Sequence, residues 1–187
     1  MTLLVPPGNY SVKLTVDGKE YTQPLTILKD PSSAGSDADI SRQMTLLWDL
    51  RKDMESAADM VNQIETIRAQ LDSLRGLVKD ASVKTAADDL DKKLTDIEDN
   101  LIQRRFTGQG QDTVRWPPKL ISKLNYLASG VGGSDFAPTT QQQEVYTTFK
   151  AQLTDLRRRL DAVLGTDLAN FNRMLREKNV GNVIASQ

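Results

Sequence analysis

The chain has 187 residues, and its 24 basic and 25 acidic side chains leave a net charge of −1. This length is sufficient for one well-buried core, or for a core with a small appendage. The near-balance of charge gives no global field that would attract nucleic acid or an anionic membrane. The sequence contains neither histidine nor cysteine, which excludes Ser-His-Asp triads, thiol nucleophiles, disulfides and zinc sites built on these residues. We therefore expect no cofactor, no metal and no nucleic-acid partner.

Membrane insertion is not expected either. No apolar run of the sequence approaches the ~20 residues that a membrane-spanning helix needs. The first residues lack the charged segment and the long apolar segment of a signal peptide. If the protein is exported, we expect the export signal to lie upstream of this sequence.

Residues 1–30 carry the pattern of a β-hairpin. Apolar and polar side chains alternate on both sides of Asp17-Gly18, which is typical of half-buried strands around a turn. The positions that share one face are Tyr10, Val12, Leu14, Val16, Tyr21, Gln23, Leu25 and Ile27. A four-residue loop from Asp17 to Glu20 would place Val16 opposite Tyr21 and Val12 opposite Leu25. An isolated hairpin is marginally stable in water, so its apolar face needs the helices, another chain or further strands to cover it.

Residues 31–36 form a linker by composition, and a long helix follows. Asp30 precedes a proline, which disfavours helix at that position. Ser36 or Asp37 can cap the next helix by accepting hydrogen bonds from its first amides. The helix should then bury one apolar stripe.

The stripe of this first helix repeats in steps of three and four, with a mean spacing of about 3.5 that is typical of a bundle or coiled-coil seam. Its members are Ile40, Met44, Leu47, Leu50, Met54, Ala57, Val61, Ile64, Leu71, Leu74 and Val78. Near Ile67 and Arg68 the stripe has a gap, and it can pass through either residue. Residues 79–83 are expected to form the turn that ends this helix.

The second helix shows the same spacing and is expected to end near Phe106, before two glycines. Its apolar positions are Ala87, Leu90, Leu94, Ile97 and Leu101. A polar loop over residues 107–115 leads to Trp116-Pro117-Pro118, where a proline in the first turn can open a short helix. The apolar face of this short helix is Leu120, Ile121, Leu124 and Leu127.

The last long helix follows a glycine-rich loop over residues 130–140. Its apolar positions are Val145, Phe149, Leu153, Leu156, Leu160, Val163, Leu168, Phe171, Met174 and Leu175. Gly165-Thr166-Asp167 predicts either a kink or a break in it, and the sequence does not distinguish the two.

The predicted fold class is mainly α: an antiparallel helical bundle of three long helices and one short helix, with an N-terminal β-hairpin appendage. The predicted division is a hairpin over 1–30, a linker over 31–36, a helical bundle over 37–180 and a flexible tail over 181–187.

Three stretches resemble the end of a known family. They are Val5-Pro6-Pro7-Gly8-Asn9-Tyr10 continuing through Ile27 to Lys29-Asp30-Pro31, then Gly110-Gln111 with Pro118-Lys119-Leu120, and then Phe171-Asn172-Arg173-Met174-Leu175-Arg176-Glu177. The first resembles the closing strands of the Ig-like module that follows the β-propeller in bacterial BNR-repeat, sortilin-like proteins often labelled glycosyl hydrolases. A helical C-terminal domain follows that module in those proteins. The other two stretches are similar to parts of that helical domain.

The resemblance implies that residues 1–30 are a remnant of an Ig-like β-sandwich and that the chain is an accessory module C-terminal to a β-propeller. It also implies an extracytoplasmic location, periplasmic or secreted, and the propeller of the parent chain as partner. The chain has no Ser-x-Asp-x-Gly-x-Thr-Trp box and no propeller blade. No catalytic residue is therefore carried over.

The carboxylates of the second helix, such as Asp88, Asp89 and Asp91, have an ordinary explanation. Glycosidases need two carboxyl groups at a fixed separation. These side chains, however, share a polar helix face with Lys92 and Lys93, where pairing between neighbours and solubility account for them. We expect no enzyme activity from this chain.

We therefore predict a non-enzymatic protein-interaction module. Trp116, beside Arg115, either forms an exposed contact or packs against the bundle end or the hairpin. The expected contact residues are Val12, Leu14, Leu25, Ile27, Arg115 and Trp116. The hairpin should either pair with another chain through its edge, as in a homodimer, or dock on the bundle. Two alternatives remain: an autonomous coiled-coil scaffold or adaptor, and a fragment of a glycoside hydrolase without its catalytic domain.

Overall fold

The computed structural model describes residues 3–185, and it is mainly helical with an antiparallel two-stranded hairpin at its N-terminal end. This confirms the predicted class. The elements are β1 (Gly8–Val16), β2 (Lys19–Ile27), α1 (Asp37–Leu77), α2 (Ala81–Leu101), α3 (Asp112–Arg115), α4 (Leu120–Val131), α5 (Thr140–Ala162), the π-helical turn η1 (Val163–Leu168) and α6 (Ala169–Glu177).

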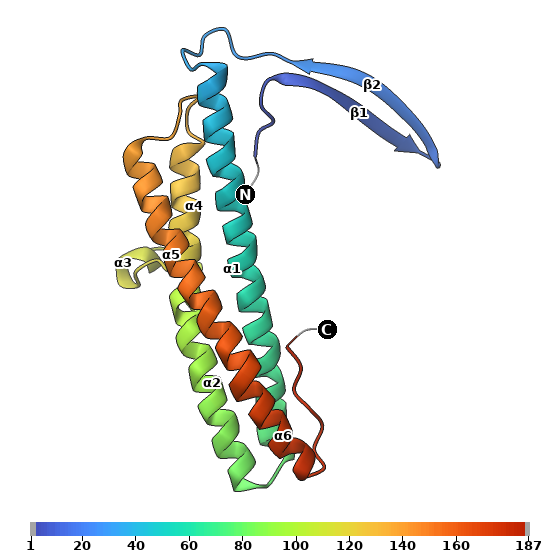
Figure 1. Ribbon diagram of the computed structural model, residues 1–187, viewed down its shortest axis with the longest axis vertical. Coiled ribbons are helices and arrows are strands. Elements are labelled where there is room, and N and C mark those ends of the chain that lie inside the picture. Colours follow the sequence, from blue (N-terminus) through green and yellow to red (C-terminus); the bar gives the residue numbers. More distant parts are fainter. Residues whose placement is uncertain (1–2, 186–187) are drawn as a thin grey trace.

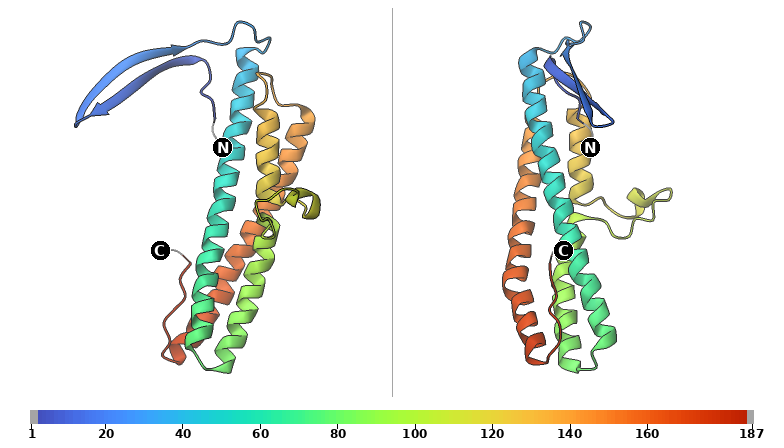
Figure 2. Two further views of the ribbon diagram at one scale, coloured as in Figure 1. Left: turned by 180° about the vertical axis from the view of Figure 1, so that it is seen from behind. Right: turned by 90° about the vertical axis from the view of Figure 1, so that its right-hand side faces the viewer.

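The helical body is long and narrow. Helix α1 runs along its whole length, α2 and then α4 return in the opposite direction, and α5, η1 and α6 descend again beside them (Figure 1). The hairpin leaves the body at the end where α1 begins, and the segment that carries α3 projects from a different side near the middle of the body (Figure 2). The body therefore holds two projecting segments well apart from each other.

Side-chain caps fix where two of the long helices begin. At the start of α1 the Ser36 hydroxyl accepts a hydrogen bond from the Asp39 amide at 3.1 Å, and the Asp39 carboxylate accepts one from the Ser36 amide at 3.0 Å. Thr139 and Gln142 form the same reciprocal pair at the start of α5. Such capping boxes satisfy amides that a helix leaves unpaired. The predicted cap at Ser36 is confirmed.

The apolar stripe of α1 is largely buried in the core of the bundle. Residues Leu50, Ala57, Ile64 and Leu71 are fully buried, and so is Ile67, through which the stripe passes. Arg68, the alternative position, turns instead toward α2, where its guanidinium donates to Asp91 and Glu98 at 2.7 Å each. Burial of this stripe is the main favourable contribution that the helices can make to folding.

The expected end of the second helix near Phe106 is wrong, because α2 ends at Leu101. Ile102 adopts an extended backbone conformation with φ −129° and ψ 154°. Beyond it Arg104 turns back and donates to the buried carboxylate of Glu98 at 3.3 Å. The polar residues after Leu101 have no core face to continue, so the chain leaves the bundle there.

The last helix does not break at Gly165. It continues from α5 into α6 through the π-helical turn η1. Val163 and Leu168 are both buried although they are five positions apart. A π-helical turn, which is wider than an α-helical turn, brings residues with this spacing onto one face. The turn therefore keeps both residues on the core side.

The hairpin has a tighter turn than expected. Val16 pairs with Lys19, Leu14 with Tyr21 and Val12 with Gln23, so the predicted pairing is wrong by two residues. Asp17 and Gly18 both have positive φ, 48° and 78°, as in the two-residue turns whose twist matches that of the strands. A shift of two residues preserves the side-chain face, so the predicted apolar set still shares one side.

Residues 181–185 of the expected tail lie against the bundle, and Val183 is 2% exposed. The predicted flexibility of the tail stays a prediction. Residues 186 and 187 lie outside the described residues.

Candidate interaction surface

One side of the hairpin is an exposed apolar surface, which we call the apolar face. Its largest exposed side chains are Val12 (52% exposed), Leu14 (59%), Val16 (47%), Tyr21 (56%) and Leu25 (44%). Among the described elements, β1 and β2 make close backbone contacts only with each other. The alternative in which the hairpin docks on its own bundle is therefore wrong for this conformation. Within residues 3–185, no helix covers these side chains.

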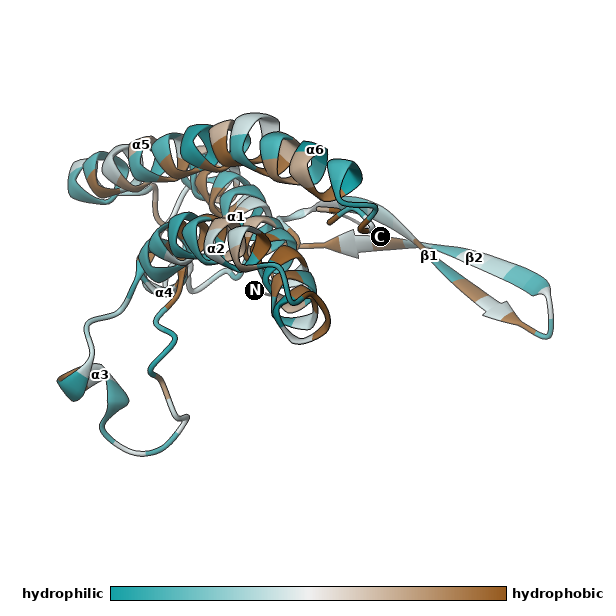
Figure 3. Cartoon of the chain, turned by 90° about the horizontal axis from the view of Figure 1, so that it is seen from below, coloured by the Kyte–Doolittle hydropathy of each residue, from teal (hydrophilic) through white to brown (hydrophobic). Residues whose placement is uncertain are grey.

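The opposite side of the hairpin is polar. Lys13 and Glu20 form an ion pair across the strands, and the Thr26 hydroxyl donates to the Asn9 side-chain oxygen at 3.0 Å. Hydrophobic positions recur along both strands, well outside the helical body (Figure 3). The hairpin thus has one apolar and one polar side, which is the pattern of a strand pair that packs one side against a partner.

The base of the hairpin, in contrast, is anchored to the helical body. The Lys29 ammonium donates to the backbone oxygens of Ser33 at 3.1 Å and Gly35 at 2.7 Å. At Gly35 a Cβ atom would lie 1.9 Å from the Asp135 backbone oxygen. Only glycine permits this approach of the linker to the loop between α4 and α5. The linker therefore holds the hairpin at one place on the bundle.

A second anchor lies directly beneath the linker. Gln43 of α1 is 6% exposed, and its side-chain amide donates to the backbone oxygen of Val131 at 2.8 Å and also to that of Ser134. This amide ties the start of α1 to the end of α4 and to the loop that receives the linker. A buried side-chain amide needs such hydrogen-bond partners. The sequence pattern does not reveal this role of Gln43, because it marks the residue only as polar.

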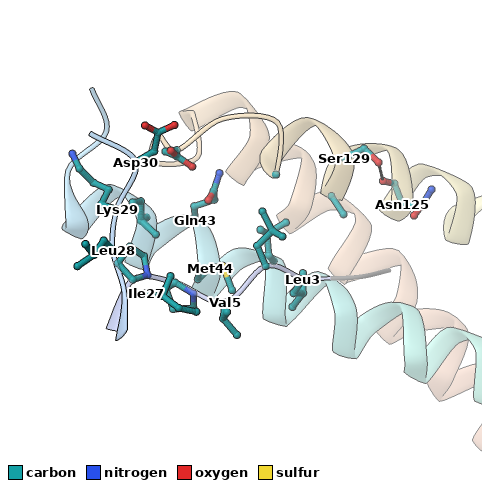
Figure 4. A pocket seen from close by; sticks show the side chains of 18 residues that line it. Leu3, Val5, Ile27, Leu28, Lys29, Asp30, Gln43, Met44, Asn125 and Ser129 are labelled. Carbon is teal, nitrogen blue, oxygen red and sulfur yellow. Dashed lines mark hydrogen bonds between the residues drawn. The ribbon is translucent and has the colours of Figure 1, made fainter. Parts of the chain in front are cut away.

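A hollow of about 460 Å³ lies between the hairpin base and the helices. Leu3, Val5 and Ile27 lie on its outer side, with Met44 on α1 and Ser129 on α4 (Figure 4). Ile27 is the one predicted contact residue that reaches it, and it is half-buried there. The lining includes the carboxylates of Asp30 and Asp135 and the hydroxyl of Ser129, which donates to the Asn125 backbone oxygen at 2.9 Å. We interpret it as the joint between hairpin and bundle.

The second group of predicted contacts lies elsewhere. Trp116 follows α3 and is half-buried, with the Arg105 guanidinium 4.6 Å from the centre of its ring. Arg115 is exposed beside it. An arginine over an indole face is a favourable contact, and neither the spacing nor the composition of this loop reveals that Arg105 is the partner. This loop projects near the middle of the body and the hairpin leaves at its end (Figure 2), so the structure does not bring the two groups together.

Several carboxylates of α2 form ion pairs with arginine, and Lys93, expected to pair within its own helix, pairs with Asp167 instead. Asp91 accepts from Arg68 at 2.7 Å and from Arg75 at 3.1 Å, while Glu98, which is 1% exposed, accepts from Arg68 at 2.7 Å. Burial alone would raise the pKa of Asp91, but the hydrogen bonds and charges of Arg68 and Arg75 lower it below its ordinary value. These groups join α1 to α2 and leave no free carboxylate pair between the two helices.

A further buried carboxylate joins α1 to α5. Asp53 is 4% exposed, and it accepts from the Tyr146 hydroxyl at 3.0 Å and from the Lys150 ammonium. Burial, followed by the hydrogen bond to Asp53, raises the pKa of Tyr146 above its ordinary value. The pair holds the hydroxyl protonated and fixes the relative position of the two helices.

No group of three acidic side chains within residues 3–185 is arranged to hold a metal ion. None of the helices in that range combines the length and the apolar character needed to cross a bilayer. No protein-family model, no curated protein and no solved structure matches this chain. The resemblance to the C-terminal region of BNR-repeat, sortilin-like proteins therefore stays a prediction.

Proposed function

We propose that this chain is a non-enzymatic protein-interaction module: an antiparallel bundle of three long helices and one short helix that presents a β-hairpin to a partner protein. The observation that carries the proposal is the apolar face, which is exposed on a hairpin whose base, among the described residues, is anchored to the helical body. An exposed apolar surface next to open strand edges favours association with another polypeptide.

The size of the apolar face limits how much its burial can contribute to the free energy of binding. Full burial of a valine or leucine side chain contributes about 1.5–3 kcal/mol. The five large side chains are each about half exposed, so covering them contributes about 4–7 kcal/mol. Association itself opposes binding by at least about 4 kcal/mol. Apolar burial alone is therefore marginal, and a stable contact also needs backbone hydrogen bonds at a strand edge.

The partner we favour is a β-sandwich or β-propeller segment of a parent chain, as the resemblance to BNR-repeat, sortilin-like proteins implies. Further strands of such a segment would cover the apolar face and pair with an edge of the hairpin at the same time. A homodimer through hairpin edges uses the same chemistry. The scaffold alternative requires an exposed apolar stripe on α1, and the burial of that stripe speaks against it.

The test compares two sets of substitutions on the same hairpin. Leu14→Thr with Leu25→Thr removes apolar surface from the apolar face and keeps a residue that favours strands. Thr15→Ser with Thr22→Ser is the matched control on the polar face. Sedimentation velocity of each chain alone and calorimetric titration with a β-propeller protein of the suspected family measure the two modes of association.

Loss of binding or of self-association by the leucine variant, with the threonine control unchanged, supports the proposal. If wild-type protein stays monomeric and binds no propeller, or if both variants behave as wild type does, the hairpin is not the contact surface.

A further inference from the structure

Residues 180–185 lie extended in a groove between α1 and α6, which we call the tail groove. We call residues 180–185 the tail segment. After α6 the chain turns at Asn179, whose φ is 57°, and the Val180 amide donates to the Leu175 backbone oxygen at 2.9 Å. The tail segment then runs back along α1 (Figures 1 and 2).

Two side-chain amides bind the backbone of the tail segment. Asn172 of α6 donates to the Val183 carbonyl and accepts from the Val183 amide, at 2.8 Å in both cases. Gln70 of α1 donates to the Ile184 carbonyl at 2.7 Å and accepts from the Ile184 amide at 3.0 Å. Each amide thus forms the pair of hydrogen bonds that a neighbouring β-strand would form. Such bonds depend on an extended backbone and not on the identity of the residue.

One side chain of the tail segment enters the bundle. Val183 is 2% exposed, whereas the next residue, Ile184, is 50% exposed. This alternation is that of an extended strand with one buried side. The tail groove therefore selects for two properties: an extended backbone at two successive residues, and an aliphatic side chain at the first of them.

The tail segment does not fill its groove. A hollow of about 350 Å³ lies beside it, lined by Leu74, Leu77 and Val78 of the bundle and by Gly181. A Cβ atom placed on Gly181 would meet no atom within 4 Å, and Leu77 is 81% exposed. A segment with a larger side chain two positions before the buried valine can therefore make contacts that the chain's own residues do not make.

These features are those of a peptide-binding groove, in which backbone hydrogen bonds provide affinity and one pocket provides specificity. We propose that the tail groove binds an extended segment of a partner protein that carries an aliphatic side chain at the Val183 position, and that the tail segment occupies this site until such a segment displaces it. The site is distinct from the apolar face of the hairpin and does not depend on it.

The direct test frees the groove within the full chain. Val183→Asp places a charge in the buried position and releases the tail segment. The probe is a fluorescent peptide with the sequence of residues 178–187, and fluorescence polarisation measures its binding. A tethered segment competes at an effective concentration of about millimolar. We therefore expect the variant to bind the peptide at least ~10-fold more tightly than wild type.

Control variants distinguish specific binding of the peptide from non-specific binding. In the Val183→Asp chain, adding Asn172→Ala or Gln70→Ala should weaken peptide binding at least ~10-fold, since each change removes two hydrogen bonds. The exposed Asn170→Ala and Gln152→Ala are matched changes and should leave it unaltered. A peptide with leucine at the Gly181 position should bind more tightly than one with alanine there, because the longer apolar side chain adds surface beside Leu74 and Leu77, which line the hollow.

A second measurement uses wild-type protein, in case the aspartate variant does not fold. Hydrogen exchange of the Val183 and Ile184 amides should be at least ~100-fold faster than that of the Leu175 amide in α6, because the tail segment opens without unfolding the helix. Equal exchange rates would show that the tail segment is a fixed part of the core and would overturn the proposal. Two results with a folded Val183→Asp chain would also overturn the proposal. One is that the chain binds no peptide, and the other is that it binds a peptide carrying the same aspartate equally well.

Discussion

Replacing Arg68 by methionine should destabilise the bundle far more than a comparable change on its surface. Arg68 lies on α1 at the border of the core, and its guanidinium donates to Glu98, whose side chain is only 2% exposed. Removing one partner of a buried ion pair leaves the other charge without compensation, which typically costs about 3–5 kcal/mol. Arg104 still donates to Glu98 at 3.3 Å and reduces this loss. We expect a decrease of about 2–4 kcal/mol in the free energy of unfolding.

Urea denaturation followed by circular dichroism measures this change, and Arg42→Met is the matched control. Arg42 also lies on α1 and pairs with Asp39, but its side chain is 66% exposed, so its loss should cost less than about 1 kcal/mol. The double variant Arg68→Met with Glu98→Met should recover much of the stability, because a buried apolar pair can replace a buried ion pair. Equal destabilisation by the two single variants would refute the reasoning.

Three further predictions concern other parts of the chain. Gly35→Ala should lower stability by about 1–3 kcal/mol, because the added Cβ forces the linker away from Asp135. Gly76→Ala in α1 should raise stability by about 0.5–1 kcal/mol, because the added Cβ meets no atom within 4 Å. Thermal unfolding compares the two variants. Because the pKa of Asp91 is lowered in the folded state, its contribution is present above its unfolded pKa of about 3.9 and is lost as pH falls through the lower folded value. Asp91→Asn should therefore flatten the loss of stability below about pH 4 in acid titrations. Leu14→Thr should leave the unfolding free energy of the helices unchanged within about 0.5 kcal/mol, and a larger loss would place the hairpin in the folded core.

Local patterns were sufficient for the buried sides of the long helices and for the faces of the hairpin, but not for the end of α2 or for α3. The spacing of apolar residues from Ile40 to Leu71 predicts the buried side of α1, because each turn of a helix repeats the same environment. Ser36 predicts its start, because a hydroxyl before the first turn accepts from that turn. Alternation in the strands likewise predicts which side chains share a face.

The features that the patterns did not predict depend on contacts between distant residues. Glu98 and Asp53 are charged, so periodicity assigns them to the surface. Their burial is explained by partners elsewhere in the chain, such as Arg68 for Glu98 and Tyr146 and Lys150 for Asp53. Asn172 and Gln70 bind backbone atoms, which leave no mark on the sequence of the segment they hold. The five-residue step from Val163 to Leu168, by contrast, was visible and is a usable signal for a π-helical turn.

The central claim is that the hairpin is covered by a partner protein in the native assembly. Hydrogen exchange of the amides from Tyr10 to Leu25 tests it most directly, measured both on the isolated chain and on the protein purified intact from its source cell. The account predicts fast exchange at the outer strand edges of the isolated chain and strong protection in the native assembly, because a partner strand pairs with one edge. Equally fast exchange of the edge amides in both samples would contradict the account.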